Sequence, residues 1–285
     1  MSYFKGRGLA TSLLIILLVA SFSLTGCFGR SNKQEAEKSG GGVQNITVAG
    51  STSVQPLTEK LAEEFSKNNP GKRIYVQGGG SSAGIQAVKT GAADIGTSSR
   101  QLKPNEKGPK EITIARDAIA LVVNPKNPVQ GLTIEQIRGI FAGEITNWQQ
   151  IGGPNQPIRA FTREEGSGTR GAFEEIVMGD SKIGGKLLVQ YSTGGVKQGV
   201  ISDPNAIGYV SLGVVDQKVK ALAVDGIVPS EESVNQNQYR IARPFLFLTQ
   251  EQPKKELVNQ FVNYVLSPEG QKIVAEDFIP VKPTQ

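Results

Sequence analysis

The sequence has 285 residues, with 31 Lys and Arg, 26 Asp and Glu, one Cys and no His. The absence of His removes Ser-His and Cys-His nucleophilic pairs together with the commonest metal ligand, and a single Cys excludes an internal disulfide and any Cys-based metal or redox site. The formal net charge of +5 suits an anionic ligand but is too small and too dispersed to indicate a nucleic-acid surface.

The first 26 residues predict a secretory signal peptide. Two basic residues precede an apolar run, of which Leu13 to Ala20 is unbroken, and the run ends in Leu24-Thr25-Gly26-Cys27. The unbroken part is shorter than the ~20 residues of a membrane-spanning helix. The Leu-Thr-Gly-Cys sequence resembles the lipobox of bacterial lipoproteins, which implies that Cys27 is lipidated and becomes the new N-terminus.

Residues 27–43 predict a flexible tether after the lipidated Cys27. Ser31 to Gly42 is polar, charged and ends in three glycines, a composition that cannot bury enough apolar surface to fold. The remainder, from about residue 44 onward, is long enough for one large or two medium domains.

The first part of the folded chain alternates strands and helices. The apolar patterns predict, in order, a strand at Ile46–Ala49, a helix with the stripe Val54, Leu57, Leu61 and Phe65, a strand at Ile74–Val76, a helix with Ile85 and Val88, and a brief strand at Asp94–Gly96. This order predicts a parallel sheet flanked by helices, with ligands outside the carboxyl ends of the strands.

Further elements follow downstream. The patterns predict strands at Ala118–Val123, Ile158–Phe161, Ile207–Val210 and Pro244–Leu248. They predict helices at Ile134–Phe141 and at about 254–266, and a further helix after Arg163 that carries Phe173, Ile176 and Val177 on one face. A last segment covers Pro268–Val274. No internal repeat of fixed period is present.

Three glycine- and hydroxyl-rich turns stand directly before helical patterns, at Gly50–Ser53, Gly78–Ser82 and Gly166–Thr169. A helix start exposes unpaired N–H groups and the positive end of the macrodipole, so it readily holds an anion. The last turn also carries Arg163 and Arg170. Backbone N–H groups, hydroxyls and an Arg fork are the donors that a tetrahedral oxyanion needs in a dry cleft.

Each of these features also has an ordinary structural explanation. Ser53 and Ser81 could be helix N-caps, and the glycines of the second turn could simply make it flexible. Arg100, Arg116 and Arg170 could be surface or salt-bridged residues. These alternatives remain open from the residues alone.

Taken together, these residues resemble the PstS family, the phosphate-binding lipoproteins of the high-affinity phosphate ABC importer. The resemblance rests on AGSTSVQP at 49–56, GGGSSAGI at 78–85, DIGTSSR at 94–100, AIALVVNPKNP at 118–128, LTIEQIRGIFAGEITNW at 132–148, REEGSGTR at 163–170 and AIGYVSLG at 206–213. It implies a two-lobed α/β periplasmic-binding-protein fold of type II, with the cleft between lobes. The implied first lobe is discontinuous, from 44–121 and 240–285, and the second is 122–239.

The resemblance also implies a phosphate site. Its implied contacts are Thr52, Ser53, Ser81, Ser99, Arg163, Ser167, Gly168 and Thr169, with Arg163 as the charged clamp. Many family members have Asp where this chain has Ser99. A carboxylate accepts the hydrogen of protonated phosphate and repels fully ionised sulfate, whereas a hydroxyl repels sulfate far less.

The expected protein is therefore a non-enzymatic, monomeric receptor without cofactor, metal or nucleic acid. Its implied partners are inorganic phosphate, the permease subunits of an ABC importer and the membrane through a lipid on Cys27, which places it on the cell membrane facing the periplasm or exterior. Alternatives are a receptor for sulfate or molybdate, a phosphate sensor or surface protein, and, with least support, a hydrolase using Ser53, Ser81 or Ser167.

Overall fold

The computed structural model describes residues 43–282. The signal peptide, Cys27 and the tether before residue 43 lie outside the described residues, so their expected roles stay predictions. No helix in the described range has both the length and the apolar character to cross a membrane.

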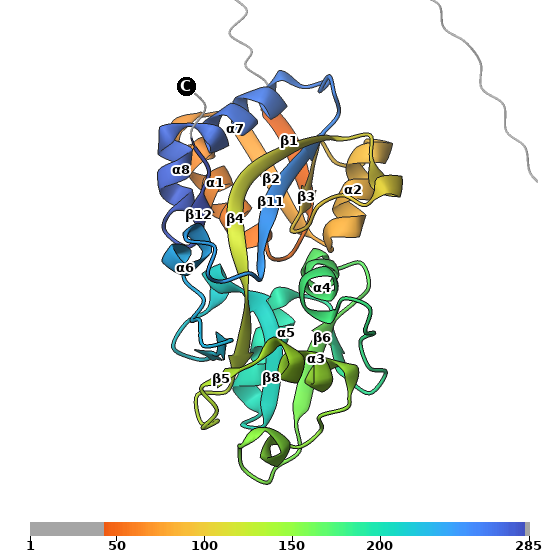
Figure 1. The fold of residues 1–285 in the computed structure, drawn as a ribbon. Coiled ribbons are helices and arrows are strands. Elements are labelled where there is room, and N and C mark those ends of the chain that lie inside the picture. Colours follow the sequence, from red (N-terminus) through yellow and green to blue (C-terminus); the bar gives the residue numbers. More distant parts are fainter. Residues whose placement is uncertain (1–42, 283–285) are drawn as a thin grey trace, which may run out of the picture. The chain divides into compact units, whose positions relative to one another are not determined.

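The described chain is a mixed α/β structure with one extended sheet (Figure 1). The eight strands on its main path run in the order β2-β1-β3-β11-β4-β8-β6-β7. Their bounds are β1 Gln44–Gly50, β2 Lys72–Gly78, β3 Ile95–Ser98, β4 Lys110–Val123, β6 Arg159–Arg163, β7 Leu188–Gln190, β8 Ala206–Ser211 and β11 Ala242–Thr249. Short strands β9 (Lys220–Ala221) and β12 (Ile279–Pro280) pair with β4, and β5 (Gly131–Leu132) pairs with β10 (Ala223–Val224).

The helices cover both faces of this sheet. They are α1 Gln55–Asn68, α2 Ser81–Thr90, α3 Ile134–Ala142, α4 Gly168–Phe173, α5 Thr193–Ser202, α6 Glu231–Asn235, α7 Glu256–Leu266 and α8 Pro268–Val274. A π-helical turn at Glu174–Met178 continues α4. We call β1, β2, β3, α1, α2, α7 and α8 the first lobe, and β6, β7, β8, α3, α4 and α5 the second lobe.

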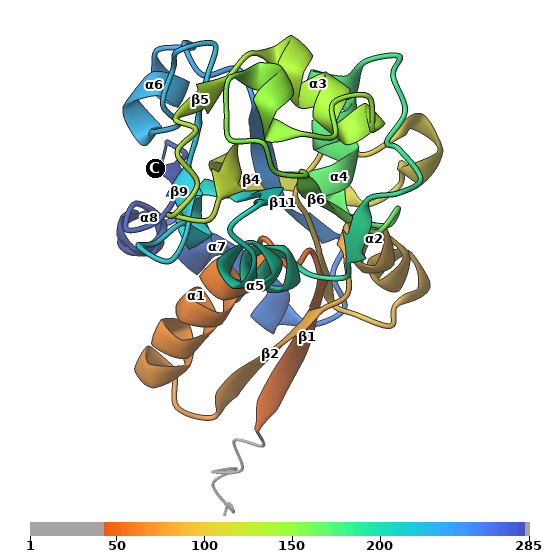
Figure 2. The ribbon, with the colours of Figure 1, turned by 90° about the horizontal axis from the view of Figure 1, so that it is seen from below.

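Each lobe has its own apolar cores. In the first lobe, α1 and α7 pack on one face of the sheet, where Phe65 meets Phe261 at a centroid distance of 5.4 Å, and α2 covers the other face against β11. In the second lobe, α3 and α4 lie on one face around Trp148 and Phe173, and α5 lies on the opposite face (Figure 2). The two-lobed type II architecture implied by the sequence is confirmed.

Strands β4 and β11 connect the lobes. They pair antiparallel from Ala242 opposite Ala118 to Thr249 opposite Lys110, while the far end of β4 pairs with β8 of the second lobe. Figure 1 shows both strands leading from the first lobe toward the second. The chain therefore passes between the lobes twice, and the residue boundaries of 121 and 239 given above stay a prediction.

The predicted elements were right in kind but short at several ends. The strand predicted at Ala118–Val123 is the end of β4, which begins eight residues earlier at Lys110. Its first half, KEITIAR, mixes charged, polar and apolar residues and is only partly buried, so it lacks the apolar run that marks the second half. The sequence patterns gave no prediction for β7 or α5, and both contribute to the site described next.

Candidate functional site

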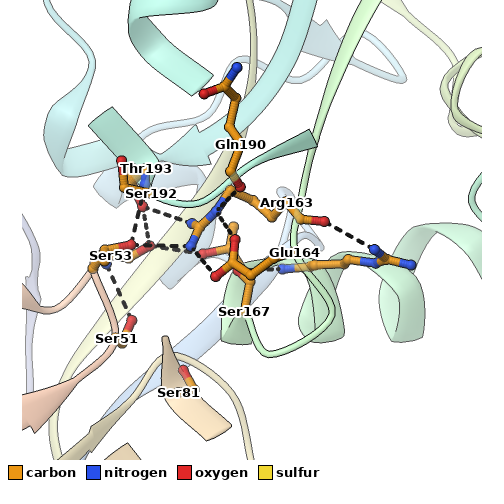
Figure 3. A network of polar contacts seen from close by, with 12 residues as sticks. Ser51, Ser53, Ser81, Arg163, Glu164, Ser167, Gln190, Ser192 and Thr193 are labelled. Atoms are coloured by element: carbon orange, nitrogen blue, oxygen red, sulfur yellow. Dashed lines mark hydrogen bonds and ion pairs between the residues drawn. The ribbon is translucent and has the colours of Figure 1, made fainter. Parts of the chain in front are cut away.

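The polar turns follow directly after the ends of five strands of the sheet. β1, β2 and β3 end in the first lobe at Gly50, Gly78 and Ser98, and β6 and β7 end in the second lobe at Arg163 and Gln190. In open α/β sheets this carboxyl-end edge is where ligands bind. Figure 3 shows Ser53 and Thr193 beside the guanidinium of Arg163, with Ser51 and Ser81 farther from it on the first-lobe side.

The first-lobe hydroxyls form one connected set. The Oγ of Ser51 donates to the Oγ of Ser99 over 2.9 Å and accepts from the backbone N–H of Ser53 over 3.2 Å. The backbone N–H of Ser99 donates to the Oγ of Ser81 over 3.1 Å. All four side chains are buried. The turns after β1, β2 and β3 therefore lie together, as the sequence analysis expected of neighbouring strand ends.

Hydroxyls also meet across the two lobes. The Oγ of Ser53 shares hydrogen bonds with the Oγ1 atoms of Thr169 at 2.8 Å and Thr193 at 2.7 Å. The Oγ1 of Thr52 accepts from the backbone N–H of Thr193 over 3.2 Å. Since Ser53, Thr169 and Thr193 are each no more than 2% exposed, these contacts lie in a dry interior between the lobes.

Arg163 supplies the positive charge at the centre of this set, and it is 1% exposed. Its Nε and Nη2 atoms donate to the two carboxylate oxygens of Glu164, each over 2.9 Å, and Nε also donates to the carbonyl of Gln190. Its Nη1 and Nη2 atoms donate over 3.2 Å to the hydroxyls of Thr193 and Thr52. Glu164 thus fixes one side of the guanidinium and leaves its end toward the hydroxyls.

A close approach of backbone to side chains explains the glycine of the third turn. A methyl group at Gly168 would meet the Oγ of Ser81, its nearest neighbour, and would lie 2.7 Å from the Oγ of Ser99. The first turn of α4 therefore lies directly against the first lobe. The backbone N–H of Ser82 also donates to the carbonyl of Gly166 over 3.1 Å, so the starts of α2 and α4 face each other.

The helix-capping alternative holds for only part of the site. Ser167 is the N-cap of α4, and its hydroxyl accepts from the N–H of Arg170. Val54 and Gly80 are the N-cap positions of α1 and α2, and neither makes a side-chain cap. Ser53 and Ser81 are therefore placed in the site without serving as caps.

The three further arginines behave differently from Arg163. Arg100 is a buried salt-bridge residue held by Glu106 and donates to Ser82, and Arg170 is paired with Glu174 while its Nη1 donates to the carbonyl of Arg163. Arg116 is partly exposed and contacts Asn235. Arg100 and Arg170 thus support the site from outside, and Arg116 takes no part in it.

Sequence reasoning missed three contributors to this site, which are Ser51, Glu164 and Thr193. The clearest signal was available for Thr193, because Ser192-Thr193-Gly194-Gly195 is also a hydroxyl and glycine turn before a helix. Ser192 caps α5 by accepting from the N–H of Gly195. A fourth helix start, from α5, therefore converges on the same point.

Tyr209 of β8 holds the end of β6, next to the turn that carries Arg163, through its hydroxyl group. Its hydroxyl shares a 2.7 Å hydrogen bond with Thr162 and accepts from the backbone N–H of Arg163 over 3.1 Å. Burial raises the pKa of Tyr209 to about 12, so the phenol stays neutral and adds no negative charge beside Arg163.

The arrangement is suited to holding an anion. It offers helix starts, buried hydroxyls and one guanidinium, but it contains no His, and no cluster of three metal-ligating side chains occurs among residues 43–282. Hydrogen bonds to a charged partner contribute about 1.5–3 kcal/mol each, so a few of these donors support tight binding.

Several known proteins are similar to this chain. The family model described as the PBP superfamily domain matches residues 35–269. The phosphate-binding protein PstS of Bacillus subtilis is 32% identical over 94% of this chain and 94% of its own length.

Two solved structures are also similar in fold and sequence. A phosphate ABC transporter substrate-binding protein of Clostridium perfringens with bound phosphate superposes with a TM-score of 0.82 at 42% identity, covering 84% of this chain and all of that one. An ABC-type phosphate transport receptor of Vibrio cholerae gives a TM-score of 0.70 at 38% identity with the same coverage.

Proposed function

The chain belongs to the PstS family of phosphate-binding proteins within the PBP superfamily, and from this membership we propose that it captures inorganic phosphate outside the cytoplasm and delivers it to an ABC importer. The observation that carries the proposal is the buried set of hydroxyls and helix starts from both lobes around Arg163. The protein is then a receptor and not an enzyme, and Ser53, Ser81 and Ser167 act as donors rather than nucleophiles.

The proposed contacts come from both lobes. Thr52, Ser53, Ser81 and Ser99 donate from the first lobe, and Arg163, Ser167, Gly168 and Thr169 donate from the second. To these we add Thr193, because its hydroxyl already bonds both Ser53 and Arg163. The anion would take the place of the hydrogen bonds that these groups make with one another.

Arg163 and Glu164 together set the charge of the site. Because Glu164 binds two nitrogens of Arg163, the pair is close to neutral as a unit. Most of the anion charge must then be met by hydroxyl and N–H dipoles, of which the backbone N–H groups at the helix starts are already fixed by the fold. This arrangement favours release as well as capture, since no bare cation is left when the anion departs.

Selectivity between phosphate and sulfate depends on Ser99. The hydroxyl of Ser99 accepts from Ser51, so its own hydrogen is free to donate to the anion. A donor does not repel a fully ionised anion, as an Asp at this position would. We therefore propose that phosphate is bound, with sulfate as a stronger competitor than in relatives that have the Asp.

Anchoring and partner binding complete the proposed function. We propose that Cys27 carries the lipid, that residues 28–43 tether the lobes to the cell membrane, and that a monomer delivers phosphate to permease subunits. Radiolabelled palmitate incorporation into the wild-type chain but not into Cys27→Ser tests the anchor.

Calorimetric titration tests the ligand. The mature chain, residues 27–285 with Cys27→Ser, is titrated with phosphate, sulfate and molybdate at two pH values. Phosphate should bind most tightly, with sulfate measurably competing. Binding of sulfate or molybdate in preference to phosphate would replace the proposed ligand, and binding of none of the three would overturn the receptor function.

A further inference from the structure

A buried ion pair lies between the strands that connect the two lobes. Asp117 of β4 and Arg243 of β11 are directly opposite in the antiparallel register. The Nε and Nη2 atoms of Arg243 both donate to the Oδ2 of Asp117, over 3.0 and 2.9 Å, and both side chains are 1% exposed. None of the contacts of the proposed phosphate site requires this pair.

The pair touches both lobes. The Oδ1 of Asp117 accepts from the hydroxyl of Ser211, at the end of β8 in the second lobe, over 2.8 Å. The Nη1 of Arg243 makes a long, 3.4 Å hydrogen bond to the carbonyl of Ser99, at the end of β3 in the first lobe. The pair is therefore held where the two connecting strands, β4 and β11, lie next to β3 of the first lobe and β8 of the second lobe.

The pair is also electrostatically close to the anion site. Arg243 contacts the proposed donor Ser99 directly, and Ser99 is bonded through its N–H to a second proposed donor, Ser81. Arg163 lies near enough that its charge lowers the pKa of Arg243, in addition to the larger lowering caused by burial. A guanidinium nevertheless remains protonated in a protein.

We propose that Arg243 is a positioning residue for the anion. Its guanidinium places a second buried positive charge behind Ser99 and fixes the Ser99 turn, and the negative charge of Asp117 partly offsets that positive charge. This inference rests on the proposed capture of phosphate. Buried charges interact through a low dielectric, so the guanidinium end of the pair, whose Nη1 faces Ser99, acts on the anion without touching it. The two partners should consequently affect binding with opposite sign.

Arg243→Gln leaves Asp117 as an unpaired negative charge near the site, so phosphate binding should weaken at least tenfold. Asp117→Asn keeps the shape of the side chain but leaves Arg243 uncompensated, so phosphate binding should stay the same or tighten up to several-fold. The double variant Asp117→Asn/Arg243→Gln should lie between the single variants. Arg243→Lys, which keeps the charge and loses the fork, should weaken binding less than Arg243→Gln.

Thermal unfolding separates this effect from damage to the fold, because both single variants should lower the melting temperature of the ligand-free chain. A purely structural pair would instead weaken binding in both variants, in parallel with the loss of stability. Lys255→Gln is the matched control, because it removes a cation from the pair with Asp94 in the first lobe. Its phosphate affinity should remain within twofold of wild type.

The experiment uses the mature chain with Cys27→Ser, titrated with phosphate and, separately, with sulfate. Weakening in Asp117→Asn equal to that in Arg243→Gln, or an unchanged affinity in Arg243→Gln, would overturn the inference while leaving phosphate capture intact. Wild-type binding of sulfate alone would overturn the proposed ligand, and the opposite-sign comparison would then be decided with sulfate. A wild-type chain that binds neither anion would overturn both.

Discussion

Replacing Gly168 by Ala should separate the cost of closing the lobes from the cost of folding. The added methyl group would meet Ser99 and Ser81, which belong to the opposite lobe, while Gly168 itself begins α4. We expect the lobes to move apart about β4 and β11 when the anion leaves, and this movement would relieve the overlap. The overlap would then oppose closure and not the folding of either lobe. Alanine is also the better helix former, so α4 itself is not weakened.

The size of the effect follows from the contact distances. The added methyl group would overlap most with the Oγ of Ser81, and its separation of 2.7 Å from the Oγ of Ser99 is also well inside van der Waals contact. Both hydroxyls are themselves held by hydrogen bonds. Overpacking of this kind costs about 1–3 kcal/mol. Because about 1.4 kcal/mol corresponds to tenfold in affinity, the dissociation constant for phosphate should rise about 5- to 150-fold.

The assay pairs calorimetry with thermal unfolding of the ligand-free chain. Gly166→Ala is the matched control, since its methyl group would lie 3.8 Å from the Cβ of Ser82, an ordinary contact. That variant should bind phosphate within about twofold of wild type. An unchanged affinity in Gly168→Ala, or a loss of melting temperature large enough to account for weaker binding, would refute the reasoning.

Three further predictions concern the charged and hydroxyl groups. Arg163→Lys should weaken phosphate binding at least tenfold in titration, because an ammonium cannot hold Glu164 and both threonine hydroxyls with one fork; near-wild-type affinity would exclude a geometric role. Thr193→Val should weaken binding about three- to tenfold with little change in stability, since it removes the hydroxyl bonded to Ser53, and unchanged affinity would take Thr193 out of the site. Arg100 holds the pKa of Glu106 below its usual value. The pair therefore contributes its full stabilisation at a pH above the usual pKa of a glutamate, and this contribution is lost as the pH falls through the lowered pKa. Glu106→Gln should therefore destabilise the chain more at about pH 6 than at about pH 3, and a pH-independent difference in melting temperature would contradict this.

The site could be predicted from the sequence only where its signals are local. Helix starts after strands are visible as glycine and hydroxyl turns, so Ser53, Ser81 and Ser167 were identified correctly as neighbours of such starts. Thr193 carries the same local signal, but β7 before it has only three residues and was not predicted. The order of strand, turn and helix, which marks the other three turns as possible anion sites, is therefore not recognisable in the sequence around Thr193.

Contacts between distant segments could not be predicted in this way. Asp117 and Arg243 are separated by 126 residues, and each stands in a strand where a charged side chain usually points to solvent. Only the antiparallel register of β4 and β11 brings them together. Likewise, the bond from Glu164 to its neighbour Arg163 depends on side-chain direction, which residue spacing along a loop does not determine.

The return of the chain to the first lobe has a consequence for the order in which the lobes fold. The helices that complete the first-lobe core, α7 and α8, are made after the whole second lobe, yet Phe261 packs on Phe65 of α1. The first lobe cannot close its core until α7 and α8 have been made, and such long-range contacts fold slowly. The second lobe, which lies almost entirely between the two crossings, can form first. Deletion of residues 256–274, which form α7 and α8, should therefore abolish the first lobe rather than merely shorten it.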